Sequence, residues 1–196
     1  MYGESKMDKK RIENAVREIL LAIGENPNRE GLKKTPARVA EMYEEILSGI
    51  SLEPENELAS CYADEEYEEM VVVKDIDFFS VCEHHLLPFF GKIHIVYIPK
   101  KDKLLGISKM VRLAEVVSHR LQLQERMTKQ IADAIMKKIS PYGAMVVIEA
   151  EHLCLTMRGV KKPGAKIVTS AIRGIFSNDS KSRIEAMELI KYGIKR

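Results

Sequence analysis

The spacing of apolar residues changes near residue 69, and this change limits the folds that the chain can form. Before it, apolar side chains recur at helical spacing over residues 8–23 and again after Thr35-Pro36. Thr35 is expected to cap this second helix and Pro36 to be its first residue. After it, runs rich in β-branched residues form two close pairs, with one long helical pattern between the pairs. The runs cover 70–81, 91–100, 144–159 (one long strand or a pair of strands) and 166–176. The helical pattern covers 108–139, and a break near Gln122 is open.

Strands that follow each other closely along a chain pair as antiparallel neighbours. We therefore predict an α+β fold, in which an antiparallel sheet has helices packed on one face and carries an N-terminal helical arm. The arm and an acidic connector would occupy residues 1–65, and the sheet domain would occupy residues 66–196. A last helix is expected after the final strand, capped by Asn178 or Asp179.

The composition excludes several classes of protein. The 196 residues suffice for one domain with an arm. The net charge of +2, from 31 basic and 29 acidic residues, lacks the strong positive balance of a nucleic-acid-binding surface. No apolar run approaches the ~18 residues that a membrane span needs, and the segment MYGESKMDKK shows no secretory signal pattern. We expect a cytoplasmic protein that binds neither nucleic acid nor membranes.

The three cysteines, Cys61, Cys82 and Cys154, are an odd number in a chain without a visible signal peptide. A disulfide framework is therefore not expected. Such thiols bind a metal, act as nucleophiles or fill space in the core, and their neighbours decide between these roles.

Two of the cysteines lie in patterns typical of a zinc site. Cys82 and His85 have the Cys-x2-His spacing that places two ligands of Zn²⁺ in one turn, and Cys154 would add a third. Three protein ligands leave one tetrahedral position for water, as in catalytic zinc sites, whereas structural zinc has four protein ligands. A closed site, with its fourth ligand from Cys61 or a nearby histidine, and a site without metal stay open as alternatives.

The segment 152–158 alternates between two faces if it is read as a strand. His152, Cys154, Thr156 and Arg158 then share one face, and the apolar side chains between them share the other. This alternation predicts a polar site on one side of the strand and core on the other.

Two histidines flank the expected thiol ligands. His84 precedes His85, and His152 lies two residues before Cys154. An imidazole beside a metal-bound water can shuttle protons, whereas an isolated histidine is more often a surface or structural residue. We expect His84 and His152 to transfer protons during the reaction.

Two further sets of polar residues, one at 108–112 and one at 124–125, either bind a ligand or lie on solvated helix surfaces. Ser108 and Lys109 open a predicted helix and Arg112 follows one turn later, an arrangement that favours an anion such as phosphate. Glu125, next to Gln124, either faces the positive end of a helix or accepts two N–H donors from a ligand.

Six segments occur in a characteristic order along the chain: TPAR (35–38), CEHHLLPFFGK (82–92), GISK (106–109), RLQLQERMTKQI (120–131), EHLCLTMRG (151–159) and VTS (168–170). Taken together, they resemble the GTP cyclohydrolase I family, whose members are zinc enzymes that convert GTP to 7,8-dihydroneopterin triphosphate and formate. This reaction is the first step of tetrahydrofolate and pterin biosynthesis.

The resemblance implies three sets of site residues. The zinc ligands are Cys82, His85 and Cys154. The catalytic residues are His84, His152 and Ser108. The residues that bind GTP are Gln124, Glu125, Lys109, Arg112, Arg158 and Arg38, the last contributed by a neighbouring subunit.

The resemblance also implies the tunnelling fold, a homodecamer with active sites at subunit contacts, and attack of a zinc-activated water on C8 of guanine while His152 protonates N7. Two alternatives compete with this reading. One is another activity on the tunnelling fold, and the other is a non-catalytic, zinc-stabilised module that binds a nucleotide without changing it.

Overall fold

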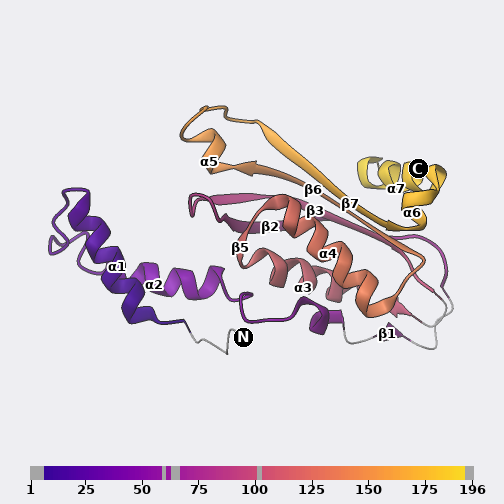
Figure 1. The fold of residues 1–196 in the computed structure, drawn as a ribbon, viewed down its shortest axis with the longest axis horizontal. Coiled ribbons are helices and arrows are strands. Elements are labelled where there is room, and N and C mark those ends of the chain that lie inside the picture. The colour runs from indigo at the N-terminus through magenta and orange to yellow at the C-terminus, as the bar shows by residue number, and fades with distance from the viewer. Residues whose placement is uncertain (1–6, 59–60, 63–66, 101–102, 193–196) are drawn as a thin grey trace.

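A computed structural model describes residues 7–58, 61–62, 67–100 and 103–192, drawn in Figure 1. The helices are α1 (Lys9–Ala22), α2 (Thr35–Ile46), the 3₁₀ helix η1 (Pro54–Leu58), α3 (Ile107–Ser118), α4 (Gln124–Ile139), α5 (Leu153–Thr156), α6 (Ile175–Asn178) and α7 (Ser180–Tyr192). The strands are β1 (Cys61–Tyr62), β2 (Val71–Cys82), β3 (Pro88–Ile98), β4 (Leu104–Leu105), β5 (Leu121–Gln122), β6 (Gly143–His152) and β7 (Lys166–Gly174).

The main sheet has five strands in the order β5-β2-β3-β6-β7, and a second small sheet pairs β1 with β4. Within the main sheet, β2, β3, β6 and β7 pair as antiparallel neighbours, which confirms the mixed α+β class. The short β5 departs from the prediction, because it runs parallel to the end of β2, with Leu121 opposite Val81. This parallel pair ties the chain between α3 and α4 to the strand end that carries Cys82.

One face of the sheet packs against α3 and α4. The inward side chains of β3 and β6, such as Ile95 and Ile148, join apolar residues of both helices in one buried cluster. Met110 and Met127, from α3 and α4, are completely buried there. The period-two alternation of the strands and the 3.6-residue period of the helices both direct apolar side chains into this core.

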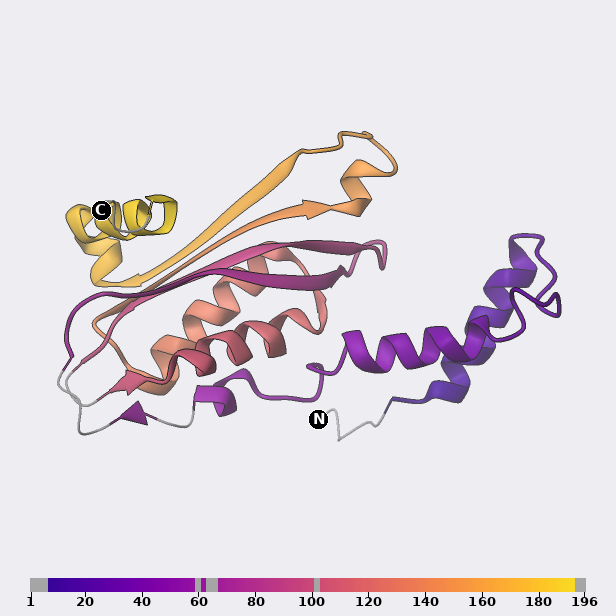
Figure 2. The ribbon, with the colours of Figure 1, turned by 180° about the vertical axis from the view of Figure 1, so that it is seen from behind.

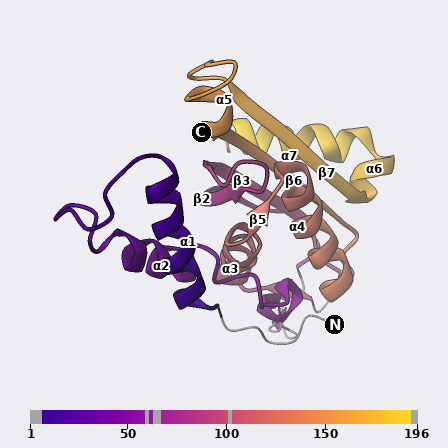
Figure 3. The same cartoon turned by 60° about the vertical axis from the view of Figure 1, so that its left-hand side comes forward.

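The prediction that helices cover only one face was wrong. The short α6 and the last helix α7 lie on the opposite face, where Phe176 and Ala186 pack against Val96 and Val147 (Figure 3). The chain crosses to that face at Gly174, whose φ of +62° and close approach to the Tyr142 carbonyl leave no room for a side chain. The sheet is therefore a buried middle layer along this stretch.

The break expected near Gln122 in the helical pattern is confirmed, because the chain passes through β5 between α3 and α4. One predicted segment boundary needs correction. The expected strand over 144–159 ends at His152, where α5 begins. The predicted cap of the last helix is Asp179, whose carboxylate accepts a hydrogen bond from the Ser182 backbone N–H at 2.9 Å.

The helices α1 and α2 form a hairpin that stands apart from the sheet, to one side (Figure 2). The hairpin continues into a loop that is fastened to the end of α3. There the Gly49 N–H donates to the His119 carbonyl at 3.0 Å, and Ser48 Oγ hydrogen-bonds His119 Nδ1 at 3.1 Å. Thr35 opens α2 without forming a side-chain cap, contrary to expectation. The domain division near residue 65 stays a prediction.

Among the described residues, no helix combines the length and apolar character that crossing a membrane requires.

Candidate metal centre and its surroundings

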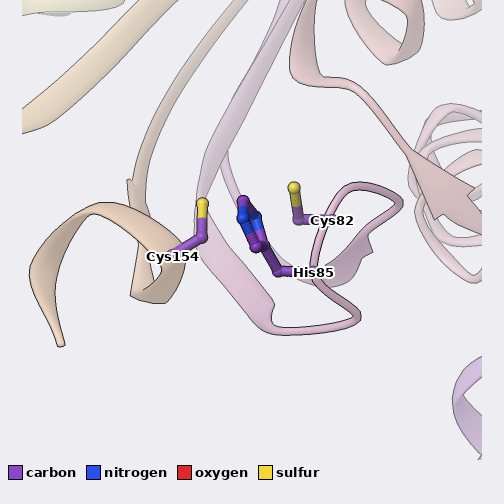
Figure 4. Close-up of side chains that lie close together, drawn as sticks. All are labelled: Cys82, His85 and Cys154. Carbon is purple, nitrogen blue, oxygen red and sulfur yellow. The ribbon is translucent and has the colours of Figure 1, made fainter. Parts of the chain in front are cut away.

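Cys82, His85 and Cys154 come together at one end of the sheet, as Figure 4 shows. Cys82 is the last residue of β2, and a tight turn follows it. In that turn the Leu86 N–H donates to the Cys82 carbonyl at 2.9 Å, and the Cys82 N–H donates to the Leu87 carbonyl at 2.9 Å. This turn folds His85 back toward Cys82, so the Cys-x2-His spacing places both side chains on one side.

The three residues fit a zinc ion. Their ligand atoms lie within 4.8 Å of one another, and ligands of tetrahedral zinc stand about 3.5–3.8 Å apart, given Zn–S and Zn–N bonds of about 2.3 Å and 2.0–2.1 Å. Small side-chain rotations would therefore close the set around an ion. Burial raises the pKa of the Cys154 thiol, and the neighbouring Cys82 raises it further. A bound cation would oppose this rise in the pKa of Cys154, because a metal ion stabilises the thiolate.

The alternation predicted for 152–158 was wrong, although the polar residues still meet. His152 is the last residue of β6, whereas Cys154 lies in the first turn of α5. A continued strand would carry Cys154 onward, but the helical turn bends it toward His85. Arg158 follows α5, and its guanidinium lies 2.8 Å from His85 Nε2.

His152 is held in a defined position between two contacts. Its ring stacks on Phe89, the residue directly opposite on β3, with the ring centroids 4.5 Å apart and the planes 9° from parallel. Its Nε2 atom lies 2.7 Å from Gln124 Oε1. Burial lowers the pKa of His152, and the negative charge of Glu125 opposes part of that effect. His152 is therefore a half-buried imidazole that favours its neutral form.

Gln124 and Glu125 begin α4 and point to different environments. The Gln124 side chain is 1% exposed, and both of its polar atoms have partners in the protein. Glu125 is exposed, close enough to His152 for its charge to act there. Glu125 therefore presents its carboxylate to solvent, whereas the Gln124 amide is enclosed by the protein.

His84 lies on the same turn as His85 and is exposed. The two rings meet edge to face, with their centroids 6.3 Å apart. Neither His84 nor His152 belongs to the trio of ligand atoms. The side chain of Cys61 lies outside the described residues, so its proposed part as a fourth ligand stays a prediction.

The predicted anion-binding residues are not brought to this site within one chain. The end of α3 lies beside β2, since the Ser80 hydroxyl donates to the Ser118 carbonyl at 2.7 Å. Ser108 and Lys109 start the same helix, about 15 Å away at 1.5 Å per residue. Arg112 lines a separate cavity of about 260 Å³ beside Ser48 and His119.

Arg38 is likewise separate from the trio. It lies in α2, in the hairpin that stands apart from the sheet, and its side chain is exposed. Of the predicted site residues, one chain thus gathers the zinc ligands, the two histidines, Gln124, Glu125 and Arg158.

A charged contact behind the turn was missed by sequence reasoning. The Arg126 guanidinium forms an ion pair with Glu83 and donates to Gln122 Oε1 at 3.2 Å. The Glu83 N–H also donates to the Gln122 carbonyl at 3.1 Å. These contacts tie the turn that carries His85 to the start of α4. Charges 43 residues apart in the chain carry no periodic signal that would have paired them.

Comparison with known proteins points to one family. The family model described as GTP cyclohydrolase I matches residues 12–191. The protein named GTP cyclohydrolase 1 of Clostridioides difficile (strain 630) is 62% identical over 186 residues, covering 95% of this chain and 98% of its own length. The protein of the same name from Pelotomaculum thermopropionicum is 61% identical over 184 residues, covering 94% and 97%.

A more distant match is the solved structure of the archaeosine synthase QueF-Like in the apo form, with 16% identity and a TM-score of 0.42, covering 54% of this chain and 93% of that one. The match of the family model and the relatives above 60% identity both span nearly the whole chain. The chain therefore belongs to the GTP cyclohydrolase I family.

Proposed function

We infer that the protein is a zinc-dependent GTP cyclohydrolase, which hydrolyses the imidazole ring of GTP at C8 and releases formate and 7,8-dihydroneopterin triphosphate. Its relatives bear the name GTP cyclohydrolase 1. The observation that carries the proposal for this chain is the meeting of Cys82, His85 and Cys154, in a set of three that leaves one tetrahedral position open.

Zinc held by these three residues would supply a water activated for attack at neutral pH. The protein's own groups then bind and orient the guanine. The exposed Glu125 carboxylate accepts hydrogen bonds from N1–H and the 2-amino group of guanine. His152, in its protonated form, donates the proton on its substrate-facing nitrogen to N7, which makes C8 more electrophilic and leaves the imidazole neutral. His84, exposed on the metal-ligand turn, assists the later opening of the ribose ring.

The triphosphate requires cationic groups, and the Arg158 guanidinium lies beside the metal ligand His85. Ser108, Lys109, Arg112 and Arg38 lie too far from the trio to act with it in one chain. We assign them to the site of a neighbouring subunit, in the homodecamer of tunnelling-fold domains that the family resemblance implies. Exposed apolar residues in the last turn of α1 and just after it are consistent with burial between copies: Ile19, Leu21 and Ile23.

Formate release from GTP by the purified protein tests this function. We expect formate from untreated protein, loss of formate after metal removal by a chelator, and recovery when zinc is added back. A parallel sample with ATP in place of GTP controls for contaminating hydrolases. Zinc-loaded, assembled protein that binds GTP and leaves it unchanged would overturn the proposal in favour of a nucleotide-binding module.

A further inference from the structure

The Gln124 amide lies in a fully occupied polar pocket beneath the site. Its Nε2 atom donates toward the backbone carbonyls of Ile148 and Ile167, at 3.1 and 3.0 Å, and toward Thr169 Oγ1 at 3.1 Å. Its Oε1 atom faces His152 Nε2 at 2.7 Å. With 1% of the residue exposed, these protein partners leave the amide no free group for a ligand.

The partners determine which way round the amide lies. Two of them are backbone carbonyls, which only accept hydrogen bonds, so the NH2 group must point toward β6 and β7. The reversed amide would place its oxygen against these carbonyl oxygens. The Gln124 oxygen therefore faces His152, and because a carbonyl oxygen only accepts, His152 Nε2 must carry a hydrogen.

Two threonines complete the anchor. Thr169 Oγ1 accepts from the Gln124 amide and lies 2.6 Å from Thr128 Oγ1, and the Thr128 hydroxyl donates to the Gln124 backbone carbonyl at 2.6 Å. When Thr169 donates to Thr128, the hydrogen bonds form a closed ring in which every hydroxyl is both donor and acceptor. Thr128 is 1% exposed, so water does not compete for this ring.

We propose that Gln124 is a positioning residue for His152: anchored by Thr128, Thr169 and two strand carbonyls, it holds the ring hydrogen on Nε2 and leaves Nδ1 to meet the substrate. This assignment rests on the proposed function, because it gives His152 a substrate to act upon. It changes the role first expected of Gln124, from contact with the guanine edge to support of the histidine beside it.

The assignment determines which ring nitrogen of His152 faces the substrate. Nε2 is occupied by its contact with Gln124, so Nδ1 is the nitrogen that remains for the substrate. Within the described part of the chain, no protein group hydrogen-bonds Nδ1. Stacking on Phe89 prevents the ring from tilting, and the Gln124 contact prevents it from turning over. Nδ1 is thus presented in one direction.

Solid-state 15N NMR on zinc-loaded, 15N-histidine-labelled protein tests the assignment without substrate, in mildly alkaline buffer where imidazoles are neutral. The His152 signals are identified by their loss in His152→Asn. We expect Nε2 in the range of a protonated ring nitrogen and Nδ1 in the range of an unprotonated one. A hydrogen on Nδ1 in the wild-type protein would overturn the proposal, and this readout needs no Gln124 variant to fold.

Kinetics with GTP distinguish a Gln124 that positions His152 from a Gln124 that contacts the guanine directly. Gln124→Met keeps the buried volume and removes the amide, so we expect kcat to fall about 10-fold to 100-fold with KM for GTP nearly unchanged. The 15N signals of His152 should then show both tautomers. The adjacent Glu125→Gln is the matched comparison, for which KM should rise. A Gln124→Met variant with raised KM, unchanged kcat and hydrogen still on Nε2 would contradict the assignment.

Failure of this inference is distinguishable from failure of the proposed function. If the wild-type protein releases no formate, the cyclohydrolase function is refuted, whatever the NMR signals show. If it releases formate and the neutral His152 ring carries its hydrogen on Nδ1, only the role given to Gln124 is refuted.

Discussion

Replacing Phe89 by leucine should destabilise the protein through the ring contacts that support the site. Phe89 is completely buried, stacks on His152 at 4.5 Å and meets Phe78 edge to face at 5.7 Å. Each aromatic pair contributes about 0.5–1.5 kcal/mol beyond burial, and the change of shape costs up to about 1.5 kcal/mol. We therefore expect Phe89→Leu to lower the free energy of unfolding by about 1–4.5 kcal/mol.

Urea unfolding at fixed zinc and protein concentration measures this change. Phe79→Leu is the matched control, because Phe79 lies in the same sheet but is 68% exposed. Its ring meets Phe90 at 5.8 Å, and we expect a loss below about 1 kcal/mol. Equal losses in the two variants, or a loss below about 0.5 kcal/mol for Phe89→Leu, would refute the reasoning that these rings support the site.

Four further outcomes are expected. Cys154→Ala should lose bound zinc and formate release together, and metal analysis showing full activity without zinc would contradict the ligand set. His152→Ala should retain zinc yet lose ring hydrolysis, whereas loss of zinc would show that His152 is a zinc ligand. Glu125→Ala should raise KM for GTP more than it weakens binding of inorganic triphosphate, and equal effects would argue against guanine recognition. Burial lowers the pKa of His94, whose Nδ1 accepts from the Asp75 N–H at 3.1 Å. Because the unfolded chain takes up this proton near pH 6.5 and the folded chain only at lower pH, stability should fall below about pH 6.5. The free energy of unfolding of His94→Gln, measured with urea, should fall less steeply as the pH is lowered. An unchanged dependence on pH would exclude His94 as the cause.

The ligand turn was predictable from the sequence because its geometry is local. Two ligands three residues apart need only one turn to converge, so Cys82 and His85 are recognisable by spacing alone. The strands and helices were likewise recognisable from their periods. Apolar runs such as IHIVYI carry side chains for both faces, a sign of a sheet covered on both sides. The expectation of helices on one face overlooked this sign, which agrees with the observed placement of α7.

The segment after His152 could not be assigned from its pattern. The alternation of polar and apolar residues there matches a strand, and a short helix of four residues is too brief to show a helical period. Its conformation is decided by tertiary contacts, including the approach of Cys154 to His85.

The separation of Ser108, Lys109 and Arg112 from the trio was also invisible in the sequence. Their motif marks a helix start, but the direction of α3 along the sheet decides which end of the molecule that start occupies. The Ser80–Ser118 hydrogen bond shows that the helix reaches the metal-ligand end with its last turn.

The pairing of Gln124 with His152 depends on a long-range contact between α4 and the end of β6. The sequence shows a glutamine beside a glutamate at a helix start, which suits a ligand-reading pair equally well. Burial separates the two roles, because Gln124 is enclosed whereas Glu125 is exposed.

X-ray absorption at the zinc edge of the purified, zinc-loaded protein identifies the atoms that bind the metal. We predict two sulfur ligands at about 2.3 Å and one imidazole nitrogen at about 2.0–2.1 Å, with one further oxygen ligand from water. A closed shell of four protein ligands, with a third sulfur or a second imidazole in place of water, would contradict the account.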